Sequence, residues 1–330
     1  MSRAEAPASV FLKRPAKGLA AGLGSRPPFI AALFICVSQP AAAQSRGVRV
    51  PVWAGSAEAD LTLASLTATV GGSPAKILQV CAPKDDLLLL LVLDLTDDLA
   101  AVEQARRTLI DRINALPPNH IVGVMTAQNG LRVLIEPTSD HQAVINAIQS
   151  QQVGGRAGLL ETVEKAAELG TAISAKSGVR VAVFYITDSD IGNYREAFTN
   201  PTINQSDGGD VSRRFSDTLI RERISRMLAT LAATDAPVFV SHLVYKNDSA
   251  NVAYQTGLLA LTKATGGNAT FSRSVSEIPA GIEATLDRIV GHYSVTVSLP
   301  ASAKKKADVI LKSKQTNDLT YRSTFVLRPE

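Results

Sequence analysis

Three nearly uninterrupted apolar runs of strand length constrain the fold of this chain most strongly. They are Leu87–Leu95, Val179–Thr187 and Pro237–Tyr245. A strand that is apolar on both faces is buried on both faces, which is typical of a parallel sheet covered by helices. Amphipathic helices are predicted between and after the runs, at residues 99–113, 159–173, 218–230, 250–265 and 276–290. This alternation predicts a doubly wound, mostly parallel α/β sheet.

One pair of strands is expected to run antiparallel within that sheet. Residues 120–127 and 131–136 are strand-like and flank the dipeptide Asn129-Gly130. Asn-Gly favours a tight hairpin turn because both of its residues tolerate positive φ. The sequence therefore predicts a hairpin at this point.

The two flanks of the α/β region have a different pattern. Residues 44–83 and 292–330 alternate polar and apolar side chains, with turn residues between the short runs. Alternation of this kind is typical of strands with one buried face. We expect an N-terminal β-strand module at 44–83, an α/β domain at 84–291, and C-terminal strands at 292–330 that pack with the N-terminal ones.

The first 43 residues predict export. They hold five Lys or Arg and one acid, then an apolar run at 29–37, Pro40 and the triplet Ala41-Ala42-Ala43. This order is that of a secretory signal peptide, and the mature chain is expected to begin near Gln44. The apolar run is shorter than the ~20 residues that span a bilayer. A secreted, periplasmic or cell-envelope location is expected; an uncleaved N-terminal anchor is the alternative.

The rest of the chain is formally neutral. Without residues 1–43, 29 basic and 29 acidic residues remain, so net charge gives no support for a nucleic-acid partner, and no membrane span is expected after cleavage. Only Cys81 remains as a cysteine. An internal disulfide and a site built from several cysteines are both excluded, and we interpret Cys81 as a packed core residue.

Polar residues follow two of the apolar runs. Asp94, Thr96 and Asp98 come at the end of the first run, and Asp188 comes after the second. Parallel strands bring their carboxyl ends to one edge of a sheet, where α/β proteins bind ligands. Such oxygen ligands suit Mg²⁺, Ca²⁺ or Mn²⁺.

The order and spacing of these residues resemble the von Willebrand factor A domain, particularly its secreted bacterial subgroup. That family has a D-x-S-x-S motif after its first strand, a threonine in a later loop, and a downstream aspartate, which together bind a metal ion. Asp94 matches the first aspartate, Thr96 and Asp98 replace the two serines, and Asp188 matches the downstream aspartate. The resemblance implies that these four residues hold Mg or Ca.

Arg156 departs from the family pattern, because it falls where the metal-binding threonine belongs. A guanidinium cannot ligate a cation, but it pairs with carboxylates through two parallel hydrogen bonds. We hypothesise that Arg156 takes the place of the metal, which implies weak or absent Mg²⁺ affinity.

The resemblance implies a non-enzymatic protein that binds a protein or cell-surface ligand through the carboxyl edge of the sheet. The polar loop at 191–211 is expected either to contact the partner or to be a non-functional insertion. His242 interrupts an apolar run, and we interpret it as a hydrogen-bonded core residue.

Three other interpretations remain open. Asp97 or Asp98 is expected to cap the following helix if it does not bind a metal. An apolar strand followed by Asp-x-Thr also resembles the nucleophile loop of haloacid-dehalogenase-like phosphotransferases, in which Asp94 attacks phosphorus and Asp188 or Asp190 holds Mg²⁺. A structural envelope scaffold is the third.

Overall fold

The computed structural model describes residues 46–56, 60–194, 217–303 and 305–327. The predicted signal peptide at 1–43 and most of the polar loop at 191–211 lie outside these ranges. Within them, no helix has the length and apolar character needed to cross a membrane.

The centre of the fold is a six-stranded sheet in the order β10–β9–β8–β5–β6–β7. All neighbouring strands pair in parallel except β6 and β7. Every residue of β5, β8 and β9 is buried, as expected for strands covered on both faces. The strands are β5 (Leu87–Asp94), β6 (His120–Thr126), β7 (Arg132–Thr138), β8 (Arg180–Thr187), β9 (Val238–His242) and β10 (Ala269–Phe271).

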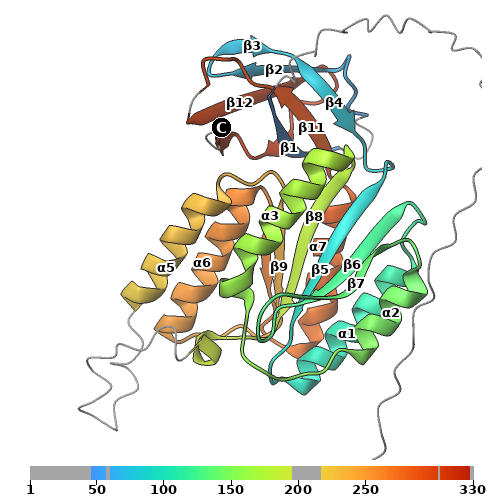
Figure 1. The fold of residues 1–330 in the computed structure, drawn as a ribbon, viewed down its shortest axis with the longest axis vertical. Coiled ribbons are helices and arrows are strands. Elements are labelled where there is room, and N and C mark those ends of the chain that lie inside the picture. The colour runs from blue at the N-terminus through green and yellow to red at the C-terminus, as the bar shows by residue number, and fades with distance from the viewer. Residues whose placement is uncertain (1–45, 57–59, 195–216, 304, 328–330) are drawn as a thin grey trace, which may run out of the picture. The chain divides into compact units, whose positions relative to one another are not determined.

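Helices cover both faces of this sheet (Figure 1). Leu87, Leu89, Leu91 and Leu93 of β5 pack in one core with helices α1 (Leu99–Asn114), α2 (His141–Ser150) and α7 (Ile278–Val290). The alternate residues Leu88, Leu90 and Val92 pack with helices α3 (Leu159–Ser177), α5 (Asp217–Leu231) and α6 (Ser249–Thr265). Short 3₁₀ turns lie at η1 (Ile191–Tyr194) and η3 (Val275–Glu277). The doubly wound α/β class predicted from the sequence is confirmed.

The predicted hairpin is also confirmed. Strands β6 and β7 pair antiparallel, and Asn129 and Gly130 in their turn have φ of 56° and 103°. No residue of β7 is buried, which agrees with its position at the edge of the sheet.

Two four-stranded sheets form a β module from both flanks of the chain. Their orders are β13–β1–β11–β4 and β14–β12–β2–β3, so each contains N-terminal and C-terminal strands. Residues of both sheets share one apolar core. The strands are β1 (Gly47–Ala54), β2 (Leu66–Val70), β3 (Ser73–Ala75), β4 (Ile77–Cys81), β11 (Tyr293–Ser298), β12 (Lys306–Ser313), β13 (Leu319–Tyr321) and β14 (Thr324–Val326).

A buried arginine ties the two segments that connect the module to the large sheet. Arg180, the first residue of β8, has no exposed side-chain surface. Its guanidinium donates to the carbonyls of Pro83 and Asp85 before β5, at 2.6 and 2.7 Å, and to those of Val290 and His292 before β11, at 2.7 and 3.1 Å. One side chain therefore fixes both connections.

Candidate functional site

The predicted site lies where the central strands end. Strands β5, β8 and β9 end at Asp94, Thr187 and His242, and because they are parallel their following loops meet at one edge of the sheet. The structure therefore brings the predicted residues Asp94, Thr96, Asp98 and Asp188 to the same edge, with the Gly154–Gly158 loop beside them.

Asp94 joins the end of β5 to the beginning of α3. The N–H groups of Gly158 and Leu159 donate to its Oδ1 and Oδ2 at 2.9 and 3.2 Å. The hydroxyls of Thr187 and Ser189 donate to Oδ2 at 3.1 and 3.2 Å. The side chain is 0% exposed, and this burial raises its pKa to about 6 against the opposing effect of the four hydrogen bonds.

Asp188 joins the end of β8 to the loop before α1 in the same way. Its Oδ1 accepts from the backbone N–H and the hydroxyl of Thr96, at 2.6 and 3.0 Å. Its Oδ2 accepts from the N–H groups of Asp97 and Asp98, at 2.9 and 2.8 Å. Successive backbone N–H groups that point at one carboxylate form an anion nest, so the loop itself stabilises the charge of Asp188.

Asp98 caps helix α1, as the capping interpretation predicts. Its Oδ1 accepts from the N–H of Ala101 at 2.9 Å. Each of the three predicted aspartates thus has a local structural partner, and Thr96 uses its hydroxyl to donate to Asp188.

The contacts described for Arg156 are with Asn129 and Glu161. Its backbone N–H donates to Oδ1 of Asn129 at 2.9 Å, and its Nη2 lies 3.4 Å from both carboxylate oxygens of Glu161. Its side chain is 54% exposed, and the hydrogen bonds described for Asp94 and Asp188 come from other residues. Backbone N–H groups and hydroxyls supply the hydrogen bonds described for these two carboxylates. The metal-substituting role of Arg156 stays a prediction.

The arrangement of these residues does not fit a directly coordinated cation. A carboxylate has about four lone-pair positions, and both Asp94 and Asp188 accept four hydrogen bonds from the chain itself. Among the predicted ligands, this leaves one position on Oδ1 of the buried Asp94, the hydroxyl oxygen of Thr96 and the second oxygen of Asp98, whereas Mg²⁺ requires about six ligands. Within the described ranges, no group of three or more His, Cys, Asp or Glu is placed to hold a metal.

Several partners at this edge were not predicted from the sequence. The Thr187 and Ser189 hydroxyls donate to Asp94, and Nε2–H of His242 donates to the carbonyl of Ser189 at 2.8 Å. Burial lowers the pKa of His242 to about 4, so its ring is neutral near pH 7, which agrees with a core histidine. Lys246 forms an ion pair with Asp190 at the same edge. The only signal in the sequence was the position of these residues just after β8 and β9.

A polar cavity of about 460 Å³ opens beside the glycine loop. Its wall is rich in amide side chains, among them Gln128, Asn129 and Gln151, and also contains Arg132. Gln128 is held in place by Thr126 and Gln151, and it donates to the carbonyl of Leu95. The cavity is thus polar, lies next to the carboxyl edge, and has a wall in which hydrogen bonds fix the side chain of Gln128.

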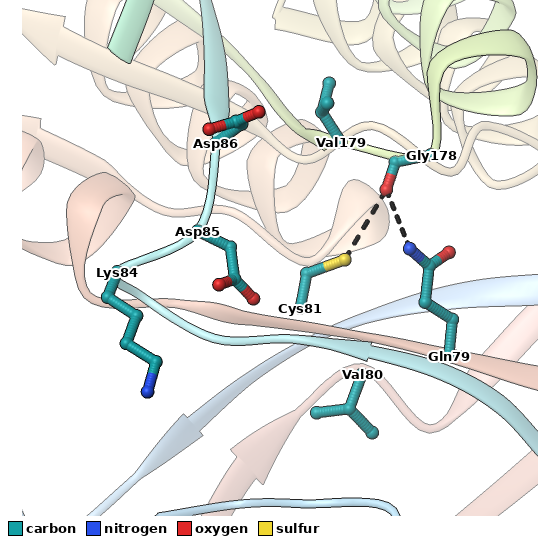
Figure 2. A pocket seen from close by; sticks show the side chains of 8 residues that line it. All are labelled: Gln79, Val80, Cys81, Lys84, Asp85, Asp86, Gly178 and Val179. Atoms are coloured by element: carbon teal, nitrogen blue, oxygen red, sulfur yellow. Dashed lines mark hydrogen bonds between the residues drawn. The ribbon is translucent and has the colours of Figure 1, made fainter. Parts of the chain in front are cut away.

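Cys81 lies at the opposite edge and is packed as expected. It lines a cavity of about 400 Å³ near the amino end of β8, together with Gln79, Lys84 and Gly178. Its Sγ and the side-chain amide of Gln79 both donate to the carbonyl of Gly178, at 3.4 and 3.0 Å (Figure 2). Burial raises the pKa of the thiol, which disfavours the reactive thiolate.

No family model matches the chain, and no curated protein sequence matches it. Solved structures do. A von Willebrand factor type A protein from Catenulispora acidiphila is 9% identical, and the match covers 87% of this chain and 74% of that one with a TM-score of 0.45. BatB from Bacteroides thetaiotaomicron is 13% identical over 62% of this chain and 98% of its own, with a TM-score of 0.36. The similarity is one of fold.

A third match carries a metal in its own structure. Proximal thread matrix protein 1 from the mussel byssus, solved with a zinc-occupied MIDAS motif, is 11% identical. The match covers 66% of this chain and 48% of that one, with a TM-score of 0.42. These structures thus include members of the family that the sequence resembles.

Proposed function

We propose that this is an exported, non-enzymatic binding protein that recognises a protein or cell-surface ligand through the carboxyl edge of its sheet, without a bound metal. One observation carries the proposal. The acidic residues of this edge are committed to internal hydrogen bonds, since Asp94 and Asp188 each accept four from neighbouring loops. We infer that these hydrogen bonds stabilise the loops that form the binding surface.

The same geometry argues against the phosphotransferase alternative. A nucleophilic carboxylate must reach phosphorus with a free oxygen lone pair. Asp94 is 0% exposed, and the N–H groups of Gly158 and Leu159 at the start of α3 donate to its two oxygens, so no phosphorus atom can approach them. An attack by Asp94 would require the first turn of α3 to move away, so we expect no hydrolysis of a generic aryl phosphate.

The ligand contacts are assigned to the polar cavity and the charges around it. Amide groups offer donors and acceptors together, which suits the backbone and polar side chains of a protein ligand. Arg132 lines the cavity, and Arg156 with its neighbour Glu161 lies on the adjoining loop and helix. The predicted contact through residues 191–211 belongs to the same proposal.

Capture from envelope extracts tests this proposal. The wild-type chain is compared with Arg132→Glu, in the cavity, and with Lys84→Glu, an exposed control of equal charge change at the opposite edge. We expect the wild type to capture one partner saturably, with and without chelator. Arg132→Glu should lose this capture, and Lys84→Glu should retain it. Equal capture by the wild type and both variants, or loss of capture on adding chelator, contradicts the proposal.

A further inference from the structure

A third cavity lies where the β module meets the ends of α6 and α7, and none of the carboxyl-edge residues lines it. It has a volume of about 330 Å³, within the range of small-molecule sites. We call it the seam pocket and define it by its lining residues: Trp53, Lys263, Gly266, Gly267, Asn268, Arg288, Thr320, Tyr321 and Arg322. Its walls therefore come from β1 and β13 of the module and from the ends of α6 and α7.

Two glycines allow these walls to approach closely. A Cβ on Gly266 would lie 2.7 Å from Pro51, and one on Gly267 would lie 1.9 Å from the carbonyl oxygen of Val238. Gly266 also has φ of 89° as the C-cap of α6. Gly266 thus lets the end of α6 pack against β1 beside the pocket, and Gly267 lets the following turn pack against β9.

The charge in the seam pocket has one sign. Lys263, Arg288 and Arg322 line it, and none of its lining residues is acidic. Arg322 is committed to the carbonyls of Thr324, Thr234 and Ala232. Within the described ranges, the side chains of Lys263 and Arg288 have no hydrogen-bond or ion-pair partner, and Nε of Arg288 is buried without one.

Aromatic rings supply the apolar part of the wall. The guanidinium of Arg288 lies 4.2 Å from the ring centroid of Trp53, and the indole N–H donates to the carbonyl of Arg288 at 2.8 Å. Stacking on Trp53 orients the planar guanidinium while leaving its N–H donors available. The buried Oδ1 of Asn268 also lacks a partner, and an amide offers either a donor or an acceptor by turning over.

A simpler explanation accounts for part of this pattern. Lys263 and Arg288 lie in the last turns of α6 and α7, where cations offset the helix dipole. Compensation of the helix dipole does not account for the cavity, for the buried donor without a partner or for the aromatic wall.

We propose that the seam pocket binds a small organic anion, with a carboxylate or phosphate head group at Arg288 and Lys263 and a planar apolar body against Trp53 and Tyr321.

Trp53 gives a direct readout, because it is the only tryptophan of the chain. The probes are benzoate and phenyl phosphate, which share a body and differ in head group, with benzylamine as the cation of similar size. Binding is followed by tryptophan fluorescence and by the indole N–H cross-peak in NMR spectra. We expect a saturable change with at least one anion and none with benzylamine; the stronger anion identifies the head group.

Two variants and a control complete the test. Lys263→Glu, at an exposed position, and Arg288→Gln should each weaken anion binding about fivefold or more. Lys84→Glu, with the same charge change as Lys263→Glu, should bind as the wild type does. Circular dichroism confirms that each variant is folded. Equal affinity for benzylamine, no saturable change with either anion, or wild-type affinity in folded Lys263→Glu overturns the proposal.

Discussion

At the scale of single residues, the carboxyl edge depends on two aspartates that act as acceptors for distant loops. Asp94 accepts hydrogen bonds from N–H groups that lie 64 and 65 positions later in the chain. Asp188 accepts them from N–H groups that lie about ninety positions earlier. Their positions at the ends of apolar strands were enough to predict that both aspartates lie at the carboxyl edge, whereas their assignment as metal ligands stays a prediction. Their partners were not predictable, because a backbone N–H has no signature in the sequence and only the folded loop determines its direction.

Removal of the Asp188 carboxylate should leave four buried or half-buried donors without an acceptor. An unsatisfied buried donor costs roughly 1–3 kcal/mol, so we expect Asp188→Ala to lower the free energy of unfolding by at least about 3 kcal/mol. Asp98→Ala removes one helix cap and should cost only about 1 kcal/mol. Urea unfolding of both variants measures the difference, and a similar small cost for each would disprove the role assigned to Asp188.

The raised pKa of Asp94 gives a pH dependence of defined sign. The unfolded chain ionises this group near pH 4, whereas the folded chain retains the proton until about pH 6. The folded state therefore binds more protons in this window, and its stability falls as pH rises from about 4 to 6. The shift of about two units corresponds to roughly 3 kcal/mol.

Comparison with Asp94→Asn isolates this contribution. The free energy of unfolding of the wild type minus that of the variant should fall between pH 4 and 6 and then remain level. Chemical unfolding at a series of pH values measures it. A difference that stays constant or rises across this window contradicts the raised pKa.

At the scale of elements, the glycine loop determines how α3 meets the sheet. A Cβ on Gly158 would lie 1.8 Å from the carbonyl oxygen of Ala127, at the end of β6. That close approach brings the Gly158 and Leu159 N–H groups onto Asp94. Apolar spacing is a local property, and it predicted five helices to within a few residues, whereas α2 (His141–Ser150) was not predicted.

Gly158→Ala should therefore destabilise the protein, by about 2 kcal/mol or more, since backbone atoms must move to admit the methyl group. Gly281→Ala is the matched control. It lies inside α7, where the added Cβ would have ordinary contacts at 3.5–3.9 Å, and alanine favours a helix by up to about 1 kcal/mol. Thermal unfolding should move in opposite directions for the two variants; a tolerated Gly158→Ala would show that the contact is not tight.

At the scale of the whole molecule, Arg180 links the module to the α/β sheet through four carbonyls. Its place inside an apolar run gave no hint of this, because its partners are loop carbonyls up to 112 positions away. The module itself was predictable as strands from both flanks. Its division into two antiparallel sheets, each built from N-terminal and C-terminal strands, was not predictable, since strand order depends on long-range pairing.

Arg180→Met should separate the contribution of the four hydrogen bonds from that of side-chain packing, because methionine fills part of the space but donates no hydrogen bond. We expect a loss of at least about 3 kcal/mol in the free energy of unfolding, because four carbonyls lose a charged donor and each such hydrogen bond contributes roughly 1.5–3 kcal/mol before the desolvation of the arginine is subtracted. Hydrogen exchange should show the greatest loss of protection at the amino ends of β5 and β11. A uniform loss across the sheet would contradict the linking role.

The central claim, that the carboxyl edge keeps its shape without a metal, is tested most directly by titration calorimetry with Mg²⁺, Ca²⁺ and Mn²⁺ near pH 7. Because Asp94 and Asp188 already accept four hydrogen bonds each, we expect no saturable heat with any of these ions at millimolar concentration. Arg156→Thr, which restores the family's ligand type, should bind more tightly than the wild type if Arg156 replaces the metal. Tight binding by the wild-type chain that Asp94→Ala abolishes would contradict the claim.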